Sequence, residues 1–235
     1  MKRLKLLATA IFFCQVAMSQ YGVTGIVGSL NMNSGDFVLF NIKGVTEANA
    51  LTANAYAGVE NSPFASDEWA YARIRLADGR GFDSVLLRIN LYENKVHFKD
   101  ENGREKMIGA DVKEIEIRDA FSKLNGTMYV AGYGEDKNEF YQVIADGKKV
   151  ALLKKLDMII KETKVFNAPD KKSFELKDGL YIYAGGTLYE ATKNCSSISW
   201  AFKNDKKATK FMDDNGLKCN KEKDLKSLVE YYNSY

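Results

Sequence analysis

Apolar and polar residues alternate through most of the chain between Glu68 and Ala191, and this period of two is typical of strands with one buried face. The clearest examples are Ala70–Leu76, Phe82–Tyr92 and Lys95–Lys99. The same pattern predicts further strands at Glu105–Ile108, Val112–Arg118, Gly126–Tyr133, Glu139–Ala145, Lys149–Lys154 with a continuation through Met158 to Phe166, Leu180–Tyr183 and Thr187–Ala191.

Turn-forming pairs separate these predicted strands. They are Asp78-Gly79, Asn102-Gly103, Asp146-Gly147 and Gly185-Gly186. Short strands with such turns at intervals of roughly 8 to 15 residues favour a mainly β (α+β) fold, built as an antiparallel meander, a sandwich or an open barrel. Strands do not alternate with helices, so a parallel sheet of the Rossmann type is not expected.

The segment before Glu68 is harder to interpret, because it is poor in charge and rich in small residues. Val23–Leu30 and Phe37–Ile42 are predicted strands. Residues 46–65 show no clear period and are predicted to form a loop or an irregular covering segment.

From residue 195 onward the period changes to that of short helices. Ser196 or Ser197 is predicted to cap a first helix, and Asp205 a second that ends at Asn215-Gly216. Asn220 is predicted to cap a third helix, because its side chain accepts a hydrogen bond from an otherwise unpaired backbone N–H.

The third predicted helix carries an apolar stripe, formed by Leu225, Leu228, Val229 and Tyr232 at positions i, i+3, i+4 and i+7. Such a stripe must be buried against another surface. One interpretation packs it on the β-rich core, and the alternative makes it a partner-binding face.

Residues 1–19 have the features of a secretory signal peptide. Lys2, Arg3 and Lys5 precede the apolar run Leu6–Ala17, and Ala17-Met18-Ser19 places small residues at the −3 and −1 positions of a cleavage site after Ser19. The apolar run is too short for a membrane anchor. We therefore expect an exported protein of the periplasm or outer envelope, with a β-rich core over residues 20–194 and a C-terminal helical segment over residues 195–235 packed on that core.

Removal of the signal peptide changes the charge of the chain. The whole sequence has 34 basic and 31 acidic residues, and three basic residues leave with the signal. The mature chain is then formally neutral, so nothing indicates a basic surface for nucleic acid. No second apolar stretch approaches the length of a transmembrane helix. Oligomeric state is left open.

Two cysteines remain in the mature chain, Cys195 and Cys219. In an oxidising compartment they either form a disulfide or stay as two buried thiols, and both interpretations remain open. A zinc site is not expected, because two cysteines and the distant His97 do not supply four ligands.

No catalytic motif stands out in the sequence. His97 is the only histidine, and it is predicted to be a surface residue because it is out of phase with Val96 and Phe98. G-x-S-x-G, H-E-x-x-H, Walker A and G-x-G-x-x-G patterns are absent. Asp100–Gly103 is predicted to be a hairpin turn rather than the start of a calcium loop. We therefore predict no catalytic residue, metal ligand or cofactor.

Three blocks of sequence between Trp69 and the C-terminus match known patterns. Residues 85–92 (VLLRINLY) with 96–98 (VHF), residues 139–148 (EFYQVIADGK) with 152–154 (LLK), and residues 224–233 (DLKSLVEYYN) are similar to the "plkyNiynd-e-ef", "G-yfe-lvdGk-sLL-k" and "dLikLveYYN" patterns. A widespread family of uncharacterised, secreted, β-rich proteins of Bacteroidota shares these patterns. In the first block Arg88, Asn90 and Tyr92 match, whereas His97 and Lys99 replace acidic residues. The resemblance implies a secreted β-rich core with a "LveYYN"-type C-terminal helix, and it implies no activity.

Three functions are consistent with these observations. Export, a compact β-rich core and the missing catalytic motifs favour a non-enzymatic structural or partner-binding module of the envelope. The aromatic content of 12% suggests a glycan- or lipid-binding domain as an alternative. A hydrolase that uses two carboxylates is the other alternative, since its acidic residues would meet only in the folded chain.

Overall fold

The computed structural model describes residues 37–39, 47–49, 56–164, 166 and 170–235. The predicted signal peptide and the predicted strand Val23–Leu30 lie outside these residues. Of the predicted strand Phe37–Ile42, the described part is β1 (Phe37–Leu39).

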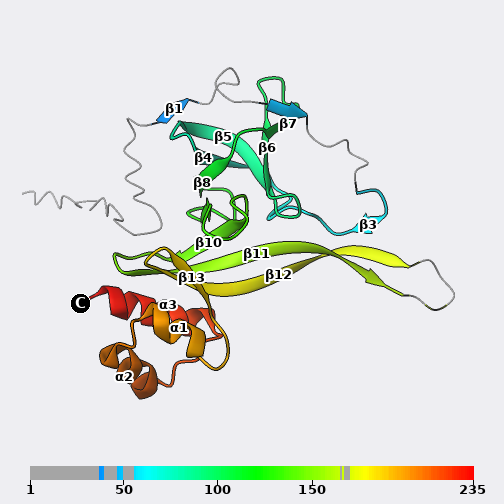
Figure 1. Ribbon diagram of the computed structural model, residues 1–235. Helices are drawn as coiled ribbons and strands as arrows, with labels where there is room; N and C mark the ends of the chain where they lie inside the picture. The colour runs from blue at the N-terminus through cyan, green and yellow to red at the C-terminus, as the bar shows by residue number, and fades with distance from the viewer. Residues whose placement is uncertain (1–36, 40–46, 50–55, 165, 167–169) are drawn as a thin grey trace, which may run out of the picture.

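The described residues form one sheet followed by three helices (Figure 1). After β1 its strands are β2 (Glu47–Asn49), β3 (Val59–Glu60), β4 (Ala70–Leu76), β5 (Gly81–Asn90), β6 (Lys95–Lys99), β7 (Glu105–Ile108), β8 (Val112–Ile117), β9 (Met128–Ala131), β10 (Phe140–Ala145), β11 (Val150–Thr163), β12 (Lys171–Ala184) and β13 (Thr187–Glu190). The helices are α1 (Ser196–Ala201), α2 (Lys206–Asn215) and α3 (Glu222–Asn233). The prediction of a mainly β fold with short C-terminal helices is confirmed.

Two antiparallel meanders make up the sheet. Its strand order is β13-β12-β11-β10-β9-β8-β4-β5-β6-β7-β2, so β8 returns to the free edge of β4 and starts the second meander. Two parallel pairings lie off this path, between β1 and β5 and between β3 and β12. The strands β2 and β3 fall in the segment 46–65 that was predicted to be irregular, and each takes its place by pairing with a strand far away in the sequence.

The longest element is the β11–β12 hairpin, in which fourteen residue pairs run from Val150–Ala184 to Thr163–Lys171. Sequence alternation identified only Leu180–Tyr183 within β12. The first half of β12 is rich in lysine and acidic residues, so it resembles a loop, and its strand conformation comes from pairing with β11. In Figure 1 this half of the hairpin lies farthest from the helices.

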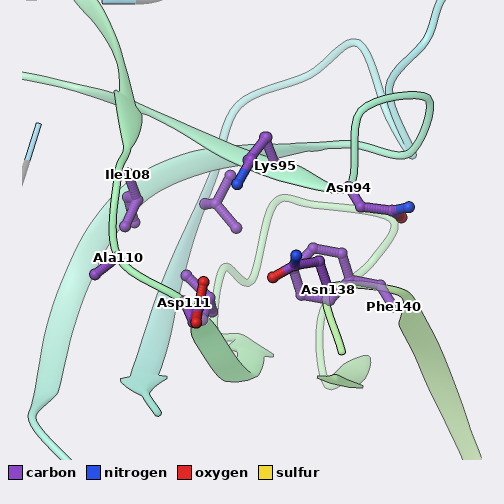
Figure 2. Close-up of a pocket in the computed structure, with 9 residues that line it drawn as sticks. Asn94, Lys95, Ile108, Ala110, Asp111, Asn138 and Phe140 are labelled. Carbon is purple, nitrogen blue, oxygen red and sulfur yellow. The ribbon is translucent and has the colours of Figure 1, made fainter. Parts of the chain in front are cut away.

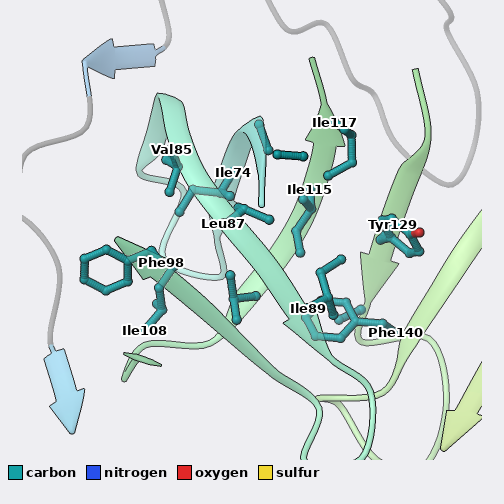
Figure 3. Close-up of a cluster of buried hydrophobic side chains, with 14 of the residues drawn as sticks. Ile74, Val85, Leu87, Ile89, Phe98, Ile108, Ile115, Ile117, Tyr129 and Phe140 are labelled. Carbon is teal, nitrogen blue, oxygen red and sulfur yellow. The ribbon is translucent and has the colours of Figure 1, made fainter. Parts of the chain in front are cut away.

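The larger of two main apolar cores lies on the inner face of β4 to β8 (Figure 3). Because side chains alternate along a strand, Val85, Leu87 and Ile89 of β5 all point into it. They meet Ile115 of β8 and Phe140 of β10, and these side chains are almost completely buried.

The second main core lies between the helices and the β10–β12 part of the sheet (Figure 1). Its helical side consists of the apolar stripe of α3, namely Leu225, Leu228, Val229 and Tyr232. All four side chains are buried, with exposures of 0 to 6%, in the same cluster as Val150, Leu152 and Ile182. The stripe is therefore occupied within the chain. The alternative interpretation of this stripe as a partner-binding face fails, because no exposed apolar surface is left on it.

A disulfide between Cys195 and Cys219 ties the helical segment together, with 5.3 Å between the two Cα atoms. Asp205 caps α2 as predicted, since its carboxylate accepts hydrogen bonds from the backbone N–H groups of Lys207 and Ala208. Gly216 ends α2 with a φ of 59°, a left-handed conformation that glycine adopts without strain.

The caps predicted for α1 and α3 are wrong. Cys195, with a left-handed backbone, is the N-cap of α1 in place of Ser196 or Ser197. Lys221 is the N-cap of α3 in place of Asn220, and it makes no side-chain capping bond.

Asn233, at the end of α3, fastens the helix to the start of β11. Its amide oxygen accepts hydrogen bonds from the backbone N–H groups of Lys149 and Val150, at 2.8 and 3.2 Å, and its amide nitrogen donates to the Val150 carbonyl at 2.8 Å. Gly147 leaves room for this contact, because a Cβ atom there would overlap the Asn233 amide. The second and third sequence blocks therefore meet at this point.

Candidate functional site

An open groove of about 450 Å³ lies where β5 and β12 meet the segment that leads from β3 to β4. We call it the aromatic groove and define it by Tyr56, Asn61, Phe64, Asp67, Arg88 and Phe174, all of which line it. Its volume is within the range typical of small-molecule sites. Its lining combines aromatic rings with a few polar side chains.

The Tyr56 side of the groove is held by a buried amide. Asn90 has no exposed surface, and its amide nitrogen donates to the Tyr56 hydroxyl at 3.2 Å. Its amide oxygen accepts from the backbone N–H groups of Tyr92 and Glu93 in the turn after β5. The Tyr56 hydroxyl in turn donates to Glu93 at 2.5 Å. Burial, with the hydrogen bond to Glu93 as the next cause, raises the pKa of Tyr56 to about 12, so this hydroxyl keeps its proton at neutral pH.

Edge-to-face contacts fix the rings on this side. The Tyr56 ring lies 5.2 Å from the Phe174 ring and 5.9 Å from the Tyr92 ring, centroid to centroid, and both pairs are nearly perpendicular. Tyr92 also contacts Phe174 at 5.4 Å. Phe174 is buried in the larger core and comes from β12, so the hairpin anchors this side of the groove.

Arg88 organises the other side. Its guanidinium carbon lies 3.6 Å from the centroid of the Phe64 ring and 4.7 Å from that of Trp69, which are cation–π contacts. One guanidinium nitrogen donates to both oxygens of Glu105, at 2.8 and 2.9 Å. The charge of Arg88 is therefore compensated within the chain, and its planar group serves as a support for Phe64.

His97 lies behind this side of the groove and is buried, contrary to the prediction of a surface residue. Only 3% of it is exposed, because Phe64 crosses the outer face of β5 and β6 and packs edge-on against the imidazole at 5.2 Å. Its Nδ1 atom lies 2.6 Å from Glu105. Within the described residues its Nε2 atom is buried and has no hydrogen-bond partner. His97 does not line the groove, so the pair of His97 and Glu105 supports the wall rather than facing a ligand.

Glu105 is ionised in this arrangement. Burial acts to raise the pKa of its carboxyl, but the hydrogen bonds from Arg88 and His97 outweigh burial and hold that pKa below its ordinary value. An ionised carboxylate only accepts hydrogen bonds, so the Nδ1 atom of His97 carries the proton that it donates.

A second cleft, of about 340 Å³, lies between β12 and the start of α3 and contains the acidic residues Asp178, Glu190 and Glu222. The Lys154 amine lies 2.7 Å from Asp178 and 3.3 Å from Glu222. The hydrogen bond to Asp178 is the main cause that raises the pKa of Lys154. A two-carboxylate hydrolase needs room for a substrate between its acids. Here the amine occupies the space between Asp178 and Glu222.

A third hollow, shown in Figure 2, is lined by residues of the turn before β6, of the β7–β8 connection and of β10. Asn94, Asp111, Asn138 and Phe140 surround a space of about 10 Å³. That is room for about one water molecule, so this hollow takes no organic ligand.

Within the described ranges, no three His, Cys, Asp or Glu side chains gather as metal ligands would. The Asp100 carboxylate forms the predicted turn, accepting hydrogen bonds from the backbone N–H groups of Asn102 and Arg104. Over the same residues, no helix has both the length and the apolar character needed to cross a membrane.

No family model matches the chain. Neither the curated proteins nor the solved structures contain a match. The aromatic groove is therefore the feature that bears on function.

Sequence reasoning missed the groove, because its residues come from three distant parts of the chain. One signal was present in the first sequence block, whose matching residues are Arg88, Asn90 and Tyr92. In the fold, Arg88 lines the groove, Asn90 positions Tyr56, and Tyr92 packs on Tyr56 and Phe174.

Proposed function

We propose that this protein is a non-enzymatic binding module of the cell envelope and that the aromatic groove is its binding site. The observation that carries the proposal is a groove whose rings are already fixed by polar groups of the chain, with the buried Asn90 on one side and the partly buried Arg88–Glu105 pair on the other. A binding site that is rigid before its ligand arrives loses little conformational entropy on binding.

The contacts of the charged groups favour binding over catalysis, because the basic side chains near the groove are already paired or packed within the chain. The guanidinium of Arg88 is engaged by Glu105, and the imidazole of His97 is packed behind Phe64. Asp67 is the exposed carboxylate of the lining, and one carboxylate does not make the pair that acid–base hydrolysis requires. Export to the periplasm or outer envelope is part of the proposal and rests on residues 1–19 of the sequence.

The test is site-specific photo-crosslinking in intact native envelopes. A photoreactive residue replaces Ala57, an exposed residue of the groove lining, and a matched copy carries it at Phe121, which is fully exposed on the β8–β9 connection. We expect one reproducible adduct from position 57 and none of the same mass from position 121. Equal adducts from both positions, or adducts from neither, would contradict a binding site at the groove.

A further inference from the structure

We infer that the ligand of the aromatic groove is a neutral pyranose ring of a glycan. This inference rests on the proposed function, because it names the ligand class of the same site. It follows from three properties of the groove: its ring surfaces, its polar atoms and its balance of charge.

The ring surfaces suit a sugar better than an acyl chain. Tyr56 and Phe64 are half-buried and present flat apolar surface along an open groove, with the buried Phe174 ring beneath, and polar side chains share the lining. A pyranose has the matching character, since its axial C–H groups form an apolar face and its hydroxyls surround that face. An acyl chain would instead need an enclosed apolar cavity, and this site is shallow and partly polar.

The polar atoms suit hydroxyl groups, which both donate and accept hydrogen bonds. Ser62 lines the groove, and its oxygen accepts from the backbone N–H of Phe64 at 3.3 Å, so its own proton remains available as a donor. Asp67 adds an exposed carboxylate, which only accepts. A donor and an acceptor in the same lining match the hydroxyls of a sugar.

The balance of charge favours a neutral ring over an acidic one. The positive charge of Arg88 is compensated by Glu105, at 2.8 Å, and Asp67 is left as a negative charge at the rim. A uronic acid or a phosphate would meet Asp67 without an unpaired cation in the lining to offset the repulsion.

Trp69 supplies a readout of binding, because its ring centroid lies 4.7 Å from the guanidinium carbon of Arg88, which lines the groove. The chain has two tryptophans, so Trp200→Phe leaves Trp69 as the only tryptophan signal. This protein is titrated with neutral hexasaccharides of glucose, mannose and xylose, with hexagalacturonate as the acidic comparison, and with vesicles of phosphatidylglycerol and phosphatidylethanolamine.

We expect at least one neutral hexasaccharide to change the Trp69 emission in a saturable way, and hexagalacturonate to bind more weakly. Phe64→Leu keeps apolar volume but removes the flat ring, and Asp67→Ala removes the exposed acceptor. Each is expected to weaken binding about tenfold, which corresponds to about 1.4 kcal/mol. Phe121→Ala, the removal of an exposed aromatic outside the groove, is the matched control and is expected to bind as the parent does.

The outcomes separate this inference from the proposed function. If no neutral hexasaccharide binds, or if vesicles bind in their place, the glycan inference is overturned. If position 57 still gives its specific protein adduct in envelopes, the groove stands as a protein-binding site. If sugars bind but Asp67→Ala and Phe64→Leu leave the affinity unchanged, the sugar site lies elsewhere and the glycan inference is overturned, and the adduct from position 57 alone then decides the proposed function. Because Asp67 is exposed, Asp67→Ala keeps the test valid even if Phe64→Leu reduces folding.

Discussion

Asn90 and Asn233 act in the same way at the residue scale, since each uses both ends of one amide to join segments that are distant in sequence. Asn90 fixes the turn after β5 and holds Tyr56, and Asn233 fixes the end of α3 to the start of β11. Neither role is readable from periodicity, because an asparagine on a strand or at a helix end is also typical of an exposed polar position. Tertiary structure alone brings backbone groups within hydrogen-bonding distance of these two amides.

Asn233→Ala is expected to lower the free energy of unfolding by about 2 kcal/mol, because it leaves backbone groups of Lys149 and Val150 without their partner. The measurement is urea denaturation followed by circular dichroism. Asn220→Ala is the matched control, since Asn220 is exposed and caps no helix. Its effect should stay below about 0.5 kcal/mol. Equal effects of the two substitutions would refute the proposed role of Asn233.

Glu105→Gln is expected to reduce the sensitivity of the fold to acid. The pKa of Glu105 lies below its ordinary value, so its contribution to stability is present above the unfolded-state pKa of about 4.3 and is lost as pH falls through the folded-state pKa. The wild-type free energy of unfolding should therefore fall more steeply than that of the variant between about pH 5 and about pH 3.

The test of this prediction is a series of urea titrations across that pH range. Arg88 and His97 face Glu105 and remain in the variant, so the substitution removes only the carboxylate of this cluster. Glu101→Gln, at an exposed turn residue, serves as the control and should follow the wild type. Parallel curves for wild type and Glu105→Gln would show that Glu105 contributes no pH dependence.

At the scale of elements, the β11–β12 hairpin changes character along its length. Its base carries Val150, Leu152 and Ile182 into the helical core, whereas Phe174 nearer the tip joins the larger core. Leu176 lies two residues after Phe174 and pairs with Met158, yet 48% of it is exposed. Whether an apolar side chain of β12 is buried therefore depends on which segments pack over that part of the strand, not on the residue type.

Phe174→Ala is expected to cost about 3 kcal/mol of stability, since it opens a cavity in the larger core and removes the ring that supports Tyr56. Leu176→Ala, on the same face of the same strand, should cost less than about 1 kcal/mol because the side chain is half exposed. Thermal and urea unfolding of both variants provide the comparison. A large effect of Leu176→Ala would contradict this assignment of Leu176 as a half-exposed side chain outside the core.

The elements show clearly where sequence is sufficient for prediction. Ala70–Leu76, Lys95–Lys99 and Glu105–Ile108 have the predicted bounds, because each lies next to a turn pair. The helix α3 was predicted from its apolar stripe. The first half of β12 and the short strands β2 and β3 were not, because their conformation is set by partners and not by their own pattern.

At the scale of the whole molecule, one sheet connects two main cores. The strand β11 contributes Leu152 to the helical core and Leu156 and Met158 to the larger core, with no break in its pairing to β12. Neither core has a sheet of its own, so loss of one removes support from the other. The aromatic groove likewise depends on the whole sheet, since its residues meet only when β3, β5 and β12 are all in place.

We expect both cores to unfold together. Trp69 lies beside Arg88 on the outer face of the first meander, and Trp200 lies on α1, so the two tryptophans report on different regions. In each single-tryptophan variant, Trp200→Phe or Trp69→Phe, the urea midpoint from fluorescence should equal that variant's own midpoint from circular dichroism, because coincident transitions of different probes indicate a two-state process. Separated midpoints within one variant would show that the helical segment unfolds independently.

The pairing of β3 with β12 also affects the order in which parts of the molecule fold. Val59 and Glu60 find Lys172 and Ser173 only after more than a hundred intervening residues have been arranged, and Asn61 bonds to Phe174 across the same span. Contacts between such remote residues form slowly, whereas the local hairpins form early. The aromatic groove is then among the last parts of the molecule to appear during folding. A newly made chain acquires its shape before it acquires its ligand, and the return of binding after refolding marks the completion of the native state.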